Sequence, residues 1–352
     1  MYFQKLTSKI WVKTEFCIFR RPFYRHYNTM KYSRFLTFIA LILASSVSAQ
    51  YFSGQNKFWK NRRHSVSFGV GIANFLGELG GRDQIGTGFI NDLEWSETRP
   101  SLQANYRYRM GDRFYAKAQL GFAIVGGNDA LTQERFRRNR NLNFRSSIFE
   151  LSAHIEFDLI TFGNKSRYNR VADGRKQISN IYISVGAGVA RFNPKGNFDG
   201  SYYALQPMST EGQGLPEGPA EYSLLTFVLP FGMGYRYEIN SDWSVGIEVI
   251  HRVTFTDYMD DASTNYFDND IIRENRGELA AYFADPSLGY YVDDNGNEIP
   301  LNSTFTGAQR GDPNDNDSYF TVMISGYYKL QSSRYTRGKG RSVKRRKRRA
   351  VF

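Results

Sequence analysis

The 352-residue sequence predicts an all-β fold, and three observations lead to this prediction. Eight segments alternate apolar and polar residues at period two, over roughly the 9 to 11 residues that a tilted membrane strand needs. Aromatic residues make up 16% of the chain although its mean hydropathy is −0.51. Outside the N-terminus no apolar run is long enough to cross a membrane as a helix. Together these features predict an eight-stranded antiparallel transmembrane β-barrel of the outer-membrane type.

The N-terminus has the form of an export signal. A short basic stretch is followed by an apolar core at residues 35–44 and by the small-x-small sequence of residues 47–49, which signal peptidase accepts. We expect residues 30–49 to be a signal peptide and residues 1–29 to be a mis-assigned upstream leader. The only cysteine, Cys17, lies in this part, so the exported chain is expected to fold without a disulfide.

The eight predicted strands show the same two-faced pattern in order along the chain. In the first strand Val66, Phe68 and Val70 alternate with serine and glycine, and the later strands place charged residues opposite their apolar ones. The predicted strands are residues 65–75, 101–110, 114–125, 143–159, 181–191, 223–237, 243–255 and 319–330. The charged residues on their polar faces include Arg107, Lys117, Glu150, Glu156, Glu248 and Arg252.

Three features favour a membrane barrel over a soluble β-sandwich, which remains the alternative. The strands exceed the five or six residues usual in soluble sheets, and short connections alternate with long ones. Aromatic residues also gather at strand ends, as in the girdles at a membrane interface. These aromatic residues are Tyr106, Tyr108, Phe114, Tyr115, Tyr235, Tyr237, Trp243, Tyr327 and Tyr328.

The even strand number places both ends of residues 50–330, the predicted barrel domain, on one side of the membrane. The short turns lie on that same side, which faces the periplasm in this fold class. Residues 161–179 are then an extended periplasmic loop, and residues 256–317 form the longest extracellular loop. Residues 331–352 are predicted to be a disordered basic periplasmic tail.

The charge of the chain is unevenly distributed. The formal net charge is +12, but residues 1–49 contribute +7 and residues 329–352 contribute +11, so the body between them is acidic. Nucleic-acid binding is therefore not expected of an exported barrel. The tail could bind an acidic protein surface or anionic lipid head groups, or remain a solvated terminus. The candidate partner-binding residues are Lys344, Arg345, Arg346, Lys347, Arg348 and Arg349.

Two groups of loop carboxylates are candidate calcium sites. They are Asp257, Asp260, Asp261, Asp268 and Asp270, and separately Asp312, Asp315 and Asp317. Neither group follows the spacing of a calcium-binding loop, and the second lacks the glycine, so ordinary polar loops with Asx turns are the expectation. We predict no metal and no cofactor.

One polar strand face carries residues that occur in hydrolases. Glu150, Ser152, His154 and Glu156 alternate on it, and nucleophilic catalysis by the serine would need a base within hydrogen-bond reach. Residues two apart on a strand lie roughly 7 Å from each other, so a direct Ser152–His154 bond is not expected. A ladder of hydrogen-bonded polar residues in the barrel interior is the favoured interpretation.

Three stretches resemble one known family. They are FGVGIANFLGEL at residues 68–79, RNLNFRSS at residues 140–147 leading into FELS, and RVTFTDYMDDAS at residues 252–263. The chain resembles the outer-membrane barrel component PorG of the Bacteroidota type IX secretion system. The most discriminating motif residues are Asp257, Tyr258, Asp260 and Asp261.

The resemblance implies a barrel without a cargo pore of its own. It also implies an outer-membrane anchor for the periplasmic ring of the lipoprotein PorK with PorN. We therefore expect a non-enzymatic subunit of this machine, in contact with outer-membrane lipid and possibly with other outer-membrane barrels. The alternatives are a lipid-modifying barrel enzyme and a purely structural or adhesive barrel.

Overall fold

The structure is a computed structural model that describes residues 63–77, 79, 97–132, 134–162, 178–240, 242–292 and 296–330. The predicted leader, signal peptide and basic tail lie outside these residues, as does most of the predicted loop at 161–179. No helix within the described ranges is long and apolar enough to cross a membrane.

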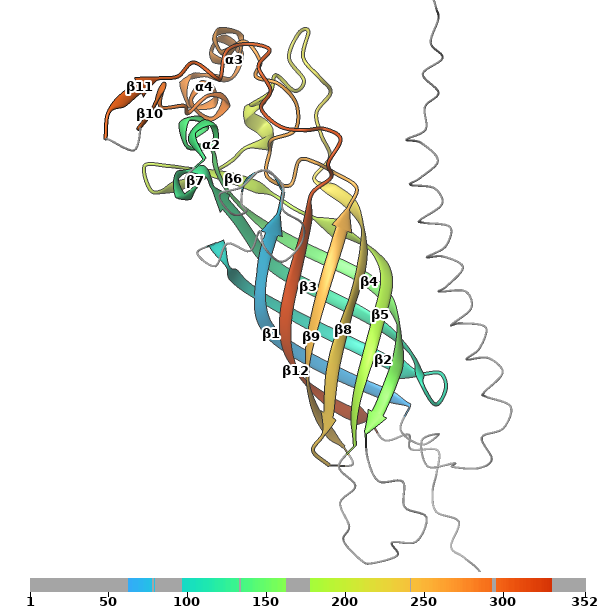
Figure 1. Cartoon of the computed structure of the whole chain (residues 1–352). Helices are drawn as coiled ribbons and strands as arrows, with labels where there is room; N and C mark the ends of the chain where they lie inside the picture. The colour runs from blue at the N-terminus through green and yellow to red at the C-terminus, as the bar shows by residue number, and fades with distance from the viewer. Residues whose placement is uncertain are drawn as a thin grey trace, which may run out of the picture. The chain divides into compact units, whose positions relative to one another are not determined.

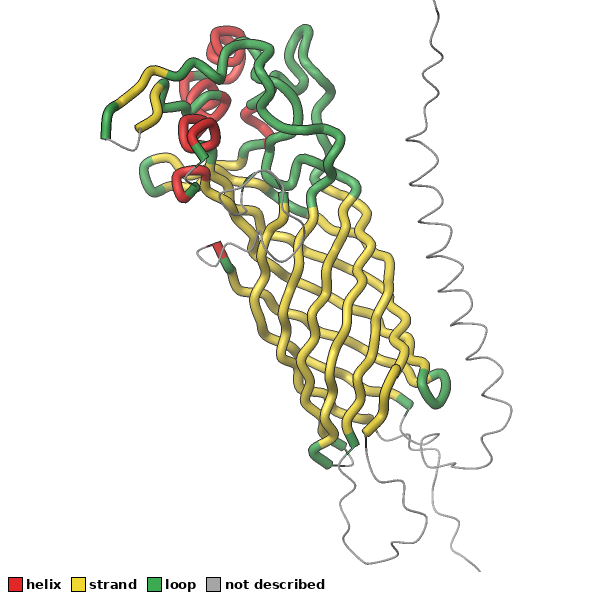
Figure 2. The backbone as a smooth tube through the Cα atoms, in the orientation of Figure 1, coloured by secondary structure: helices red, strands yellow, loops and turns green. Residues whose placement is uncertain are grey.

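Eight antiparallel strands form a closed barrel (Figures 1 and 2). Each strand pairs with the next one around the wall, and β12 pairs with both β9 and β1, which closes the ring. In their order around the barrel, the strands are β1 (His64–Leu76), β2 (Arg99–Arg109), β3 (Phe114–Asn128), β4 (Asn143–Phe162), β5 (Ser179–Arg191), β8 (Leu225–Glu238), β9 (Trp243–Thr254) and β12 (Ser318–Leu330). All eight predicted strands are confirmed, and closure excludes the sandwich.

The apolar face of the barrel points outward. Phe68, Val185 and Ile324 are 59%, 62% and 64% exposed, whereas Gln119 and Glu248 on the opposite face are 1% exposed. A soluble barrel has the reverse arrangement, with its polar side chains in water. Lipid is the solvent that stabilises an apolar exterior around a polar interior.

The two ends of the barrel differ. At one end, here called the turn end, short turns join β2 to β3 and β8 to β9, and there β1 begins and β12 finishes. Outward rings pack there as predicted for a girdle, with Trp243 4.9 Å from Tyr328 between centroids. The prediction is wrong for two girdle residues, Tyr115 and Tyr327. Both occupy inward-facing positions in the alternation of their strands, so their rings lie in the lumen, where Arg107 lies over both of them.

At the other end, here called the cap end, the long connections fold into a compact cap over the barrel (Figure 1). Its elements are η4 (Asp129–Leu131), α2 (Arg135–Arg140), β6 (Pro194–Phe198), β7 (Ser201–Ala204), η5 (Gln206–Met208), α3 (Asn269–Arg276), α4 (Glu278–Ala284), β10 (Tyr290–Val292) and β11 (Glu298–Pro300). A hydrophobic core that includes Phe75, Phe144, Phe192, Met259 and Phe283 joins the cap to the barrel mouth. The sequence predicted only loops here.

Candidate functional site

A network of ion pairs fills the middle of the barrel. Its centre is Glu156 on β4, which lies 2.7 Å from Arg107 and 3.5 Å from both Lys117 and Arg236. Each cation comes from a different strand, and all four side chains are almost fully buried. Buried charges need partners, and inward positions of three other strands, of which only β3 is paired with β4, supply them.

The network continues in both directions along the lumen. Lys117 also lies 2.8 Å from Glu248, and Arg236 lies 3.1 Å from Asp158. In the other direction Arg252 pairs with Glu150. Four basic and four acidic side chains of the described strands take part, so their formal charges balance.

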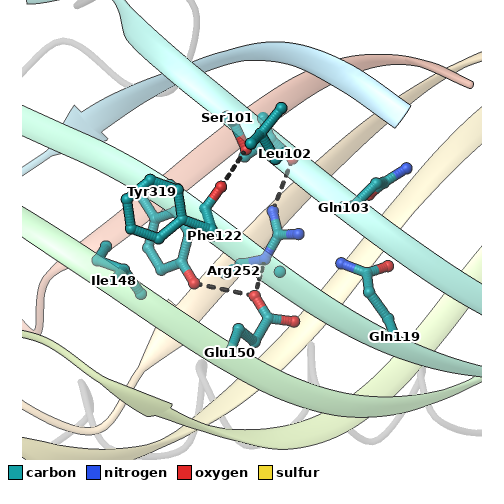
Figure 3. A pocket seen from close by; sticks show the side chains of 12 residues that line it. Ser101, Leu102, Gln103, Gln119, Phe122, Ile148, Glu150, Arg252 and Tyr319 are labelled. Carbon is teal, nitrogen blue, oxygen red and sulfur yellow. Dashed lines mark hydrogen bonds and ion pairs between the residues drawn. The ribbon is translucent and has the colours of Figure 1, made fainter. Parts of the chain in front are cut away.

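Side chains leave little space in this part of the lumen. Arg252 and Tyr319 both point at Glu150, with Tyr319 Oη 2.9 Å from the carboxylate (Figure 3). The cavity beside them, which Gln103 and Gln119 also line, has a volume of about 10 Å³. That is room for one water at most. The described residues thus leave no space for a substrate at this level.

The structure corrects the expected separation of Ser152 and His154. Ser152 Oγ lies 2.9 Å from His154 Nε2, within hydrogen-bond range. The backbone spacing of residues two apart does not prevent this, because side chains lean along the strand and the imidazole ring reaches toward the serine.

The surrounding bonds nevertheless hold the serine in an unsuitable state for attack. Ser152 Oγ is only 2.5 Å from Glu150 Oε1, and its single proton is donated there. His154 Nε2 must then donate to Ser152, while Nδ1 accepts from Ser184 at 3.1 Å. An imidazole in this tautomer has no lone pair directed at the serine proton, so the four residues form a polar ladder.

The predicted family motif lies in the cap, where it forms a buried hub. Asp261 accepts hydrogen bonds from Thr210 at 2.6 Å and from Tyr222 at 2.5 Å, and it lies 3.7 Å from Arg310. Its φ of 69° is in the left-handed region, which aspartate tolerates better than most residues. Burial raises the pKa of the Asp261 carboxyl to about 6, although Arg310, Thr210 and Tyr222 act in the opposite direction.

Arg310 joins this hub to a second carboxylate. Its guanidinium lies 3.0 Å from Glu211, which also accepts from the Thr264 hydroxyl at 2.6 Å. Burial acts to lower the pKa of Arg310, but Glu211 and Asp261 outweigh it and hold the pKa above its ordinary value. Arg310 therefore fastens the connection before β8 to the connection between β9 and β12.

The other motif residues extend the hub. Asp260 accepts a hydrogen bond from the backbone N–H of Leu79 at 3.1 Å, which fastens the connection after β1. The Tyr258 ring stacks on Tyr222 with centroids 4.4 Å apart, and Asp257 is buried. The motif shapes the cap, and its partners could not be predicted from the sequence because they are polar residues in distant loops.

Besides Asp260 and Asp261 in the hub, four more of the candidate calcium ligands have protein partners. Asp268 caps the N-terminus of α3, and Asp312 accepts from the backbone N–H of Asn314 at 3.1 Å in an Asx turn. Asp270 pairs with Arg273, and Asp317 accepts from the backbone N–H of Met259 at 2.8 Å. Within the described ranges no cluster of three or more potential ligands is arranged to hold a metal ion. The predicted partner-binding residues 344–349 lie outside those ranges.

A closed eight-stranded barrel with an apolar exterior and a charged, hydrogen-bonded interior defines the class of protein: the chain is an outer-membrane β-barrel protein. No protein-family model and no curated protein matches it.

Solved structures of small outer-membrane proteins are similar to it at a distance. Neisserial surface protein A is 8% identical over 76% of this chain and 97% of its own, with a TM-score of 0.32. Ail of Yersinia pestis is 9% identical over 77% and 99%, with a TM-score of 0.30. OprG of Pseudomonas aeruginosa is 10% identical over 77% and 98%, with a TM-score of 0.29. These likenesses are too distant to bear on what the chain does.

Proposed function

We propose that the protein is a non-enzymatic outer-membrane subunit of the type IX protein secretion machinery, which anchors or contacts the periplasmic ring proteins PorK and PorN. The observation that carries this proposal is the filled lumen, in which Glu156 is surrounded by three cations. A lumen blocked in this way suits an anchor better than a conduit for cargo. The resemblance of residues 252–263 to PorG supplies the identity of the machine.

In this proposal the cap end faces the outside and the turn end faces the periplasm. Short turns on the periplasmic side and longer loops outside are usual for outer-membrane barrels. The basic residues Lys344, Arg345, Arg346, Lys347, Arg348 and Arg349 then follow β12 on the periplasmic side, where an acidic surface of the ring could bind them. The cap is available to other outer-membrane barrels.

Deletion of the gene tests the role in secretion. We expect exported cargo to accumulate inside the cell, and expression of the wild-type chain to restore export. Normal cargo secretion in the deletion strain would instead favour a purely structural or adhesive barrel.

A truncation tests the contact with the ring. Removal of residues 334–352 leaves all eight barrel strands in place, so the barrel should still fold and reach the outer membrane. We expect PorK and PorN to co-purify less with the truncated chain. Unchanged co-purification would remove the tail from the proposal and leave the secretion role to be judged by the gene deletion.

The 2.9 Å contact between Ser152 and His154 favours a second candidate, a lipid-modifying barrel enzyme. This candidate requires His154→Ala to change the lipid A profile of the cell. We expect the profile of that strain to match the wild type, because Ser152 donates to Glu150.

A further inference from the structure

A groove of about 530 Å³ lies in the outer wall of the barrel. Outward apolar side chains of neighbouring strands line it, and Arg191 and Leu225 stand at its end. The apolar lining residues include Phe68, Leu102, Ala104, Leu120, Phe122, Phe149, Leu151 and Val189. Ala104 is short, and the larger side chains around it form the walls.

The groove runs from the middle of the barrel wall toward the cap end. One row of directly paired residues follows it, from Phe68 through Ala104, Leu120 and Leu151 to Val189. Phe68 is the fifth residue of β1, whereas Val189 is the eleventh of β5, and both strands begin at the turn end.

The length of this row matches one leaflet of a membrane. Four strand spacings of about 4.8 Å span about 19 Å. With strands tilted by about 40°, the row rises by about 12 Å, roughly half of an apolar band that is about 25 Å tall. An acyl chain in the groove would therefore run from the membrane interface at the cap end to the middle of the bilayer.

The end of the groove nearest the cap is positively charged. Among the outward-facing positions of the described barrel strands, only Arg145 and Arg191 carry a permanent charge, and both lie at the cap end of adjacent strands. The Arg191 guanidinium makes no hydrogen bond or ion pair with any described residue. Cations on a lipid-facing wall are tolerated near the interface, and here they lie beside an apolar groove.

A third cation strengthens this patch. Lys195 on β6 is the direct cross-strand partner of Arg145, and like charges in that position repel each other. No carboxylate of the described chain pairs with either residue; the Arg145 guanidinium lies 5.5 Å from the centre of the Tyr202 ring. An anion bound between the two side chains would relieve the repulsion.

The spacing of the cations indicates more than one phosphate. Arg191 on β5 is paired in register with Phe149 on β4. Arg145 lies on β4 as well, four residues from Phe149 toward the cap end. Four residues of strand span about 13 Å. A head group with two separated phosphates matches this spacing, with one phosphate at each end of the patch.

We propose that this face binds lipopolysaccharide, with an acyl chain in the groove and its phosphates at Arg191 and at the Arg145–Lys195 pair. The inference rests on the proposed orientation with the cap end outside, because phosphorylated glycolipid occupies the outer leaflet. It does not depend on a role in secretion, because binding can be measured on the purified barrel.

The test is a titration of the purified full-length barrel, in phosphatidylcholine nanodiscs, with bisphosphorylated lipid A. We expect saturable binding that Arg145→Gln, Arg191→Gln or Lys195→Gln each weakens about fivefold, and that the triple variant weakens on the order of a hundredfold. Arg191→Lys, which keeps the charge, and Arg113→Gln, which removes an exposed charge at the turn end, should bind like the wild type.

The groove is tested separately by filling it. Ala104→Phe should weaken lipid A binding, whereas Val249→Phe, which adds a ring to the opposite wall, should not. Equal binding by the wild type and the triple variant would overturn the proposal. So would equal affinity for dephosphorylated lipid A or for phosphatidylglycerol. Heat-modifiable electrophoretic mobility shows that each variant is folded.

Discussion

The lumen and the cap hub both bury charges, but they pair them in different ways. In the lumen, four cations and four carboxylates sit on alternate positions of regular strands, so each meets a partner on a neighbouring or facing strand. In the hub, Arg310 meets Glu211 and Asp261 only because two irregular connections, the one before β8 and the one between β9 and β12, come together. Buried charges must be paired in both regions. In the lumen the strand register brings the partners together, and in the hub the packing of loops does so.

This difference has a consequence for stability. The lumen pairs join strands all around the wall, so breaking them should weaken the whole barrel. The hub joins only connections at the cap end, so breaking it should open the cap locally.

The largest effect is expected from Glu156→Gln. This change leaves Arg107 without a carboxylate partner, whereas Lys117 keeps Glu248 and Arg236 keeps Asp158. An unpaired buried charge costs about 5 kcal/mol at the upper end of the usual range. The urea midpoint of the refolded barrel should fall markedly. The control is Glu238→Gln, whose partner Lys329 lies 2.6 Å away in a partly exposed pair; it should cost less than about 1 kcal/mol. Similar midpoints for both variants would contradict a structural role for the network.

Arg310→Met should cost about 4 kcal/mol, but only within the cap. It leaves two buried carboxylates facing each other, so hydrogen exchange in residues 257–264 should accelerate while the barrel strands stay protected. Arg273→Met changes the same residue type on the exposed face of α3 and should leave exchange unaltered. A fall in barrel protection equal to that of the cap would show that the two regions unfold as one unit.

The pH dependence of the cap follows from Asp261. Its pKa rises from 3.8 to about 6 on folding, so between these values the folded cap binds a proton that the unfolded chain has lost. The stability that this group contributes is highest below pH 3.8. It falls by on the order of 3 kcal/mol as the pH rises to 6.

Asp261→Asn should remove this slope, because asparagine does not titrate and tolerates the left-handed backbone. The measurement is the protection of cap amides at pH 4 and pH 7, corrected for intrinsic exchange. An unchanged slope in the variant would assign the pH dependence to another group.

The smallest effect is expected from the stacked pair of Tyr258 and Tyr222. Tyr258→Leu removes a ring contact worth about 1 kcal/mol, whereas Tyr258→Phe keeps the ring and removes only the hydroxyl. The difference in cap protection between the two variants isolates the stacking energy. If the leucine and phenylalanine variants open the cap equally, the ring contact adds nothing to the hub.

The barrel could be read from the sequence because each strand carries its own signal. Alternation at period two assigns both faces of residues 143–159 without reference to any partner strand, and the inward charges Glu150 and Glu156 are on the predicted side. The prediction for Tyr115 and Tyr327 is wrong because an aromatic residue at a strand end belongs to a girdle only when it occupies an outward-facing position of that strand.

The cap could not be read in this way. The motif residues Asp260 and Asp261 were identified from the sequence, but Glu211 and Arg310 were not, since nothing local in a polar loop shows that a charge will be buried. The Ser152–His154 contact escaped for a related reason: backbone spacing does not fix where two side chains meet.

The sequence by itself determined the eight strands and the two faces of each, because these depend on a periodicity confined to each strand. Strand length, aromatic strand ends and the alternation of short and long connections then predicted that the apolar face meets lipid. Only the tertiary structure decided which charges pair across the lumen, how the long connections fold into a cap, and that a groove with cations at its upper end lies on one wall. Those features depend on the closure of the barrel, which sets the stagger of the strands and brings residues far apart in the chain into contact.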